Sequence, residues 1–338
     1  MKKIVLNMML VIMSIGLFAC GSKSLANVET KTENLESKKI KVVTTIYPEY
    51  DWVNNIISGK EDKFDVSILM TSGVDLHNFK PSAKDILDIG TADLFIYVGG
   101  ESDKWVDDAV RTASNKNLKT INLMEVLKDK VKVEEEIEGM EEEEHHHEEG
   151  EEHAEGEEEI EYDEHVWLSL NNAITICNEI EKNIVELDAQ NASAYYSNLE
   201  KYLSVLRLLD EGYKSVVNSA SRKVVLFGDR FPFRYMVDDY GIKYFAAFKG
   251  CSAETEASFE TIKFLADKLG EEKLPYVLKI ERSDDKIARA IIDNSTNKDA
   301  QVETMYSIQA VSNDDINAGE TYYTYMQKNL EVLKKVLN

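Results

Sequence analysis

The sequence predicts an α/β protein made of two βα lobes, each with a parallel sheet, which are joined by a long rigid helix and enclose a cleft. Runs of β-branched residues alternate with helical patterns in the first half of the chain and again after residue 221. Such alternation favours parallel sheets with right-handed crossovers. The length of 338 residues also exceeds the roughly 250–300 residues that a single core organises. We therefore expect two lobes.

The first residues have the pattern of a bacterial export signal. Lys2 and Lys3 precede an apolar stretch over residues 4–18, which is shorter than the roughly 20 apolar residues that span a membrane. The stretch ends in LFAC, the pattern at which lipoproteins are cleaved and lipid-modified. Residues 1–19 are therefore expected to be a lipoprotein signal peptide, Cys20 the lipidated residue, and residues 20–38 a flexible tether. An ordinary cleaved signal with a chance cysteine is the alternative.

The periodicity divides the rest of the chain into an N-terminal lobe over residues 39–132, a linker helix over residues 165–220 and a C-terminal lobe over residues 221–338. Strands are expected at residues 40–46, 64–70, 93–98, 119–123, 223–227, 244–248, 275–281 and 301–308. Helices are expected at residues 50–57, 82–89, 104–113, 233–240, 258–269, 285–294 and 320–337. The linker has apolar residues at helical spacing over residues 171–220, with an interruption near residues 191–193.

An acidic insertion lies between the first lobe and the linker. Residues 133–164 contain 19 acidic residues and no Lys or Arg, so this segment carries most of the net charge of −24. Such a charge excludes a general role in binding nucleic acid, because phosphate repels it. The composition cannot form a packed core. We therefore expect a mobile loop.

Four of the six histidines lie in this insertion, namely His145, His146, His147 and His153. Imidazole and carboxylate groups are ligands of Zn²⁺ and, with more oxygen, of Mn²⁺. The insertion is therefore interpreted as a metal-collecting loop. A solvated segment that only adds charge is the alternative.

Further candidate ligands follow the predicted strands. His77 lies in the loop after the second strand, and His165 begins the linker. Asp229 and Glu281 follow strands of the second lobe, and ligand sites of open α/β sheets gather at the carboxyl ends of strands. These positions predict a closed metal site between the lobes, which suits capture better than catalysis. Ion pairs of Asp229 and Glu281 with nearby arginines are the alternatives.

The two remaining cysteines, Cys177 and Cys251, leave two alternatives open. They could form one disulfide in an oxidising compartment, or they could be two buried free thiols.

At these residues the chain resembles the substrate-binding lipoproteins of bacterial zinc and manganese ABC importers, in particular the zinc branch. The resemblance is carried by GVDLHNFKPS at residues 73–82, DEHVWL at residues 163–168, the acidic histidine-rich insertion and YYTYMQKNL at residues 322–330. It extends from Ile40 to the end of the chain. It implies two βα lobes bridged by a rigid helix, one metal between them, and delivery to a membrane permease driven by a cytoplasmic ATPase.

The resemblance also implies a ligand set. His77 and His165 match the first two ligands of the family. The third ligand, a His or Glu after the first strand of the second lobe, falls on Arg230 or Asp229; arginine stays protonated, so Asp229 is expected. The fourth position falls on Gln309, which offers only a neutral carbonyl oxygen. Glu281 or water is the alternative fourth ligand.

We therefore expect a monomeric extracytoplasmic lipoprotein that captures zinc, with manganese as the second choice, and delivers it to an ABC permease. The alternative is a diverged paralogue that acts as a surface adhesin or a metal buffer. A third reading, an exported metallohydrolase using Asp229 and Glu281, lacks both the His-Glu-x-x-His and the Gly-x-Ser-x-Gly motif. We expect no enzyme.

Overall fold

The computed structural model describes residues 38–71, 73–141, 161–252 and 256–338. The first lobe contains one four-stranded sheet with the order β2-β1-β3-β4, in which all strand pairs are parallel. Its strands are β1 (Ile40–Thr44), β2 (Phe64–Ile68), β3 (Leu94–Tyr97) and β4 (Lys119–Asn122). Its helices are α1 (Tyr47–Ile56), α2 (Ala83–Gly90), α3 (Val106–Arg111) and α4 (Leu123–Leu127).

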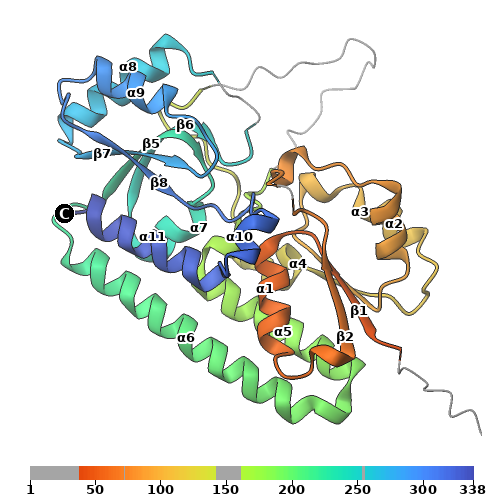
Figure 1. The fold of residues 1–338 in the computed structure, drawn as a ribbon. Coiled ribbons are helices and arrows are strands. Elements are labelled where there is room, and N and C mark those ends of the chain that lie inside the picture. Colours follow the sequence, from red (N-terminus) through yellow and green to blue (C-terminus); the bar gives the residue numbers. More distant parts are fainter. Residues whose placement is uncertain (1–37, 72, 142–160, 253–255) are drawn as a thin grey trace, which may run out of the picture. The chain divides into compact units, whose positions relative to one another are not determined.

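The second lobe repeats this topology, because its sheet has the order β6-β5-β7-β8 and is again parallel throughout (Figure 1). Its strands are β5 (Val224–Phe231), β6 (Lys243–Lys249), β7 (Tyr276–Ile280) and β8 (Gln301–Met305). Its helices are α7 (Arg234–Tyr240), α8 (Phe259–Glu271), α9 (Lys286–Asn294), α10 (Asn313–Asn317) and α11 (Tyr322–Val336). The predicted two-lobed α/β fold is confirmed. The short helices α4 and α10 were not predicted.

The segment between the lobes is a pair of helices, α5 (Leu170–Leu187) and α6 (Ala192–Ser219). A short turn at Asp188–Asn191 separates them, where the Asp188 carboxylate accepts hydrogen bonds from Asn191 Nδ2 and Tyr195 Oη at 2.7 and 2.6 Å. The 28-residue α6 packs against α1 of the first lobe and α11 of the second. The expected long connecting helix is therefore α6, and α5 lies beside it as a separate helix (Figure 1).

Strand β5 is longer than expected and irregular. It continues to Phe231, and its pairing with β6 shifts register between Phe227 and Arg230. A Cβ atom at Gly228 would lie 2.7 Å from the Cα of Ala288 in α9, so only glycine permits this approach of strand and helix. Such a bulge turns the following side chains relative to a regular strand. Asp229 therefore lies within β5, although the sequence placed it after the strand.

Both ends of the acidic insertion have defined contacts. Val133 and Tyr162 form an antiparallel bridge. Glu141 accepts a hydrogen bond from the backbone N–H of Ser258 and donates its own N–H to the carbonyl of Ala247. Within the segment that the sequence predicted as a mobile loop, residues 133–141 and 161–164 therefore include positions with defined contacts. These acidic residues find backbone donors on the second lobe, a pairing that composition alone does not reveal.

Candidate metal centre

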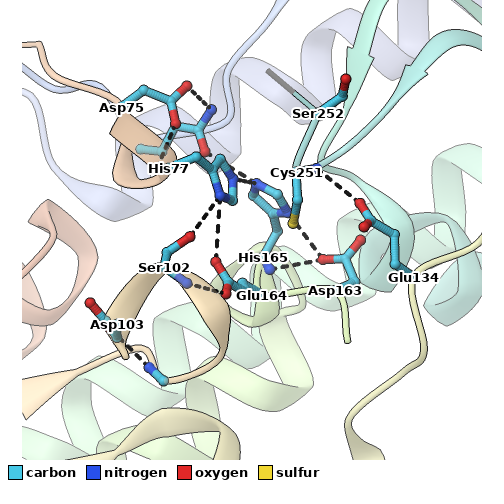
Figure 2. Close-up of polar contacts among 12 residues, drawn as sticks. Asp75, His77, Ser102, Asp103, Glu134, Asp163, Glu164, His165, Cys251 and Ser252 are labelled. Carbon is cyan, nitrogen blue, oxygen red and sulfur yellow. Dashed lines mark hydrogen bonds and ion pairs between the residues drawn. The ribbon is translucent and has the colours of Figure 1, made fainter. Parts of the chain in front are cut away.

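Two histidines from distant parts of the chain meet in the structure. His77 lies in a single helical turn (Leu76–Asn78) after β2, and His165 directly precedes the turn Val166–Leu168 that leads into α5. Their Nε2 atoms lie 3.2 Å apart, and their ring centroids are 5.1 Å apart. The sequence singled out both residues, and the structure brings them together (Figure 2).

The ring of His165 is fixed by Asp163. One carboxylate oxygen of Asp163 lies 2.8 Å from the backbone nitrogen of His165 and 3.1 Å from its Nδ1 atom. A carboxylate accepts hydrogen bonds, so Nδ1–H donates to it and Nε2 is turned toward His77. His165 is fully buried, and beyond it the indole of Trp167 donates to the carbonyl of Ser307 at 2.8 Å. The motif DEHVWL thus supplies both the imidazole and the group that orients it.

The ring of His77 is oriented in a similar way. Its Nδ1 atom lies 2.8 Å from Ser102 Oγ and 3.5 Å from Glu164 Oε2. Glu164 is itself held by the backbone N–H of Ser102 at 2.8 Å. Figure 2 shows Ser102 and Glu164 next to the ring of His77. Both imidazoles therefore present Nε2 to one point.

The two imidazoles differ in their affinity for a proton. Burial, and then the neighbouring His165, lower the pKa of His77 to about 3. His77 therefore holds a lone pair on Nε2 at neutral pH. Burial also disfavours the charged form of His165, but the carboxylates of Asp163 and Glu164 raise its pKa above the usual value.

A thiol that the sequence did not single out as a ligand completes the cluster. One ring nitrogen of His77, one of His165 and the sulfur of Cys251 all lie within 4.8 Å of one another. Among the described residues, these three form a group of at least three His, Cys, Asp or Glu side chains whose spacing suits a metal ion. Cys177 and Cys251 are both free thiols in this structure, of which Cys177 is buried and Cys251 is half-buried. Burial, and then the carboxylate of Glu134, raise the pKa of the Cys251 thiol well above its usual value.

Arg230 and Gln309 meet the first lobe at the same place. Arg230 Nη2 and Gln309 Nε2 lie 2.5 and 2.9 Å from Asp75 Oδ2, and Asp75 stands two residues before His77. Burial alone would raise the pKa of Asp75, but Arg230 and His77 lower it below the usual value. The amide oxygen of Gln309 lies 3.1 Å from His165 Nε2. Arg230 is one of the two residues on which the resemblance places the third ligand. Its guanidinium instead forms an ion pair between the lobes with Asp75.

The carboxylates of Asp229 and Glu281, which the sequence predicted as ligands, form hydrogen bonds to the backbone in this structure. Asp229 accepts hydrogen bonds from the backbone N–H groups of Arg230 and Ile280, at 2.8 and 3.0 Å. It lines a cavity of about 640 Å³ beside the site, together with Arg230 and Lys286. Neither carboxylate belongs to the cluster of His77, His165 and Cys251. The bulge in β5 accounts for Asp229, since it directs this side chain toward β7.

Glu281 holds the turn that follows β8. Its carboxylate accepts from Ser307 N, Ser307 Oγ and Ile308 N at 2.7, 2.8 and 2.9 Å. Ile308 has a φ of 62°, a conformation that a β-branched residue rarely adopts. The three bonds stabilise this turn, and the next residue is Gln309. Glu281 therefore acts on the site through Gln309. The alternative ion pairs of Asp229 and Glu281 with arginine side chains are not formed within the described residues.

The remaining predicted site residues lie outside the described residues. These are Cys20, His145, His146, His147 and His153.

Comparison with known proteins identifies the family. Residues 42–336 match the family described as ZnuA, zinc-uptake complex component A, periplasmic. The chain is 28% identical over 304 residues to the zinc-binding protein AdcA of Streptococcus pyogenes, covering 89% of this chain and 56% of that protein. It therefore spans little more than half the length of those relatives. It is also 28% identical over 319 residues to the high-affinity zinc uptake system protein ZnuA of Bacillus subtilis, covering 94% and 93% of the two chains.

Solved structures show the same fold. The metal-dependent lipoprotein YcdH of Bacillus subtilis superimposes with a TM-score of 0.68 at 26% identity, covering 88% of this chain and 99% of that one. The periplasmic zinc-binding protein TroA of Treponema pallidum gives a TM-score of 0.69 at 21% identity, covering 89% and 99%. The laminin-binding adhesin Lmb of Streptococcus agalactiae gives 0.69 at 22% identity, covering 88% and 100%. The match of the family model over residues 42–336 shows that this protein belongs to the ZnuA family of periplasmic zinc-uptake components.

Proposed function

We propose that this chain captures Zn²⁺ between its lobes and delivers it to the permease of an ABC importer, with no catalytic role. The observation that carries the proposal is the 3.2 Å separation of His77 Nε2 and His165 Nε2. Two nitrogen ligands of a tetrahedral zinc, each about 2.05 Å from the metal, lie about 3.3 Å apart. The two imidazoles thus have the spacing that zinc requires.

The groups around the pair support capture. Asp163 and Ser102 hold the Nδ1 atoms, so both imidazoles keep Nε2 available for a metal. Binding needs neutral imidazoles, and the metal would lie between the two Nε2 atoms. Zinc is preferred over manganese because imidazole nitrogen suits zinc, whereas manganese favours oxygen ligands.

The location proposed for the chain is the outer face of the cytoplasmic membrane, through a lipid on Cys20. The supporting observation is the LFAC sequence after an apolar stretch. In the part of the chain that the structure describes, no helix is long and apolar enough to cross a membrane. The chain is proposed to act as a monomer, with the permease as its partner, and to bind no nucleic acid.

His145, His146, His147 and His153 are proposed to collect metal near the cleft. Their clustering among carboxylates supports this role. A deletion of residues 142–160 leaves residues 133–141 and 161–164 intact and removes all four histidines. Zinc titration of the full chain should then give one tight equivalent and weaker ones, and the deletion variant should retain the tight equivalent alone. An unchanged number of weak sites in the deletion variant would exclude a collecting role.

Growth under zinc chelation tests the transport function in cells. A strain that lacks this protein, in a host without a second zinc importer, should grow poorly under a chelator and recover with added zinc. Normal growth would favour the adhesin or metal-buffer alternative. The likeness to laminin-binding proteins is one of fold, so it does not favour that alternative.

A further inference from the structure

We propose that the thiolate of Cys251 is the third protein ligand of the captured zinc and that it adds to the preference of the two imidazoles for zinc over manganese. This inference rests on the proposed function. Its basis is the cluster of His77, His165 and Cys251, whose donor atoms lie within 4.8 Å of one another. Figure 2 shows the three side chains converging from separate segments of the chain.

The residues at the end of β5, where the resemblance places the third ligand, are engaged in other contacts in this chain. The end of β5 offers Asp229 and Arg230, but Asp229 binds backbone N–H groups and Arg230 binds Asp75. The neighbouring strand β6 supplies a donor in their place. Phe231 of β5 pairs with Lys249 of β6, and Cys251 stands two residues after that pair. The thiol therefore reaches the site from the same edge of the sheet.

The backbone around Cys251 is shaped for this approach. A Cβ atom at Gly250 would lie 2.9 Å from the carbonyl oxygen of Phe231 and 3.1 Å from Cε1 of His165, so only glycine lets the chain pass so close to the imidazole. On the other side, Glu134 accepts a hydrogen bond from the backbone N–H of Cys251 at 2.9 Å. Cys251 is thus held beside His165 by contacts that do not involve its sulfur.

The distances fit zinc after a small adjustment. In a tetrahedral site with Zn–N about 2.05 Å and Zn–S about 2.3 Å, nitrogen and sulfur lie about 3.6 Å apart. The sulfur therefore needs to approach the nitrogens by about 1 Å, which a side-chain rotation provides. Zinc displaces the thiol proton to water and forms the S–Zn bond. Thiolate is a soft ligand that suits zinc, whereas manganese favours carboxylate and water.

Cobalt spectroscopy tests the sulfur ligand directly. The full chain carrying Cys20→Ala and Cys177→Ala, purified in detergent, keeps Cys251 as its single thiol. Titration with Co²⁺ should produce the near-ultraviolet charge-transfer absorption of a thiolate–cobalt bond, and the further change Cys251→Ser should remove it. Zn²⁺ should also slow alkylation of Cys251 by iodoacetamide. Absence of the band in the single-thiol chain, together with alkylation that zinc does not slow, would overturn the proposal.

Affinity measurements separate this inference from the proposed function. In competition with a chelator, Cys251→Ser should weaken zinc binding by on the order of 100-fold, and Cys251→Asp should lower the ratio of zinc to manganese affinity by roughly tenfold. If Cys251→Ser binds zinc as tightly as its parent while His77→Ala does not, the thiolate inference fails and zinc capture stands. If His77→Ala also binds as tightly, zinc capture in this cleft fails as well.

Discussion

The guanidinium of Arg230 lies 2.5 Å from the carboxylate of Asp75, and this ion pair joins β5 of the second lobe to the loop that carries His77. Both side chains are largely buried, with 18% and 14% of their surfaces exposed. Removing one partner of a buried pair leaves the other charge without compensation. The pair therefore ties the lobes together beside the candidate metal site.

Asp75→Asn should lower the free energy of unfolding by about 1–3 kcal/mol, because the charge-assisted bonds to Arg230 and Gln309 are lost. Asp108→Asn is the matched control, since its ion pair with Arg111 is 75% exposed on both sides and should contribute below about 0.5 kcal/mol. Urea unfolding of both variants in the presence of EDTA measures the difference. Equal, small effects would show that the ion pair between the lobes does not stabilise the chain.

Glu281→Gln should destabilise the chain and leave the zinc stoichiometry unchanged. The three donors that meet the carboxylate would then face an amide with one oxygen, so a loss of about 1–3 kcal/mol is expected. The exposed Glu272 provides the control substitution Glu272→Gln. Thermal unfolding and zinc titration on the same samples are the measurements. Loss of the tight zinc equivalent in a folded Glu281→Gln variant would restore Glu281 as a ligand.

Asp163→Ala should weaken zinc binding by about 10–100-fold, because the Nδ1–H of His165 loses its acceptor and the ring is no longer fixed. The control Asp188→Ala also removes a carboxylate that accepts two hydrogen bonds. Both come from side chains, and the carboxylate lies at the turn between α5 and α6. Its zinc affinity should equal that of the unaltered chain. A chelator-competition assay compares the two, and similar affinities for both variants would contradict the positioning role of Asp163.

Asp51 gives the chain a pH dependence that is independent of the metal. This carboxylate lies 3.3 Å from the backbone nitrogen of Tyr322 and 3.4 Å from the hydroxyl of Tyr202, and burial raises its pKa to about 6. The native carboxyl therefore binds a proton more tightly than the unfolded one, whose pKa is about 3.9. The stability that the protonated Asp51 carboxyl contributes to the folded state is fully present below about pH 4 and is lost as the pH rises through about 6.

Between about pH 4 and pH 7.5, the free energy of unfolding of Asp51→Asn should accordingly rise by up to about 3 kcal/mol relative to that of the unaltered chain. Denaturant unfolding across this range, with EDTA present, measures the change. Asp65 is exposed, so the stability of the control variant Asp65→Asn should depend on pH in the same way as that of the unaltered chain. A constant difference between Asp51→Asn and the unaltered chain at every pH would show that Asp51 does not titrate in this way.

The histidines of the site could be predicted from the sequence, because each lies in a recognisable local motif. The motif of His165 also includes Asp163, which orients its ring. Cys251 could not be found in this way, since its neighbours carry no motif for metal binding. The rule that ligands follow parallel strands would nonetheless have nominated it, because it comes directly after the predicted strand at residues 244–248. For Asp229, the same rule did not anticipate the bulge in β5, which extends the strand beyond that residue.

The fold was predictable for a different reason. Strands such as β1 and β7 and helices such as α9 have regular apolar patterns that do not depend on distant contacts. The division of the linker into α5 and α6 depends on the side-chain bonds of Asp188 and on packing against both lobes, which periodicity does not contain. The contacts of Glu134 and Glu141 with the second lobe are of the same kind.

The central claim is that zinc is captured by the imidazoles of His77 and His165. After deletion of residues 142–160, these two are the remaining histidines of the six in the chain. Zinc titration of this deletion variant, with a chelator as competitor, should give one tight equivalent. That equivalent should be lost on His77→Ala or His165→Ala and kept on the neighbouring change Asn78→Ala. A tight equivalent that persists when both histidines are replaced would contradict the account.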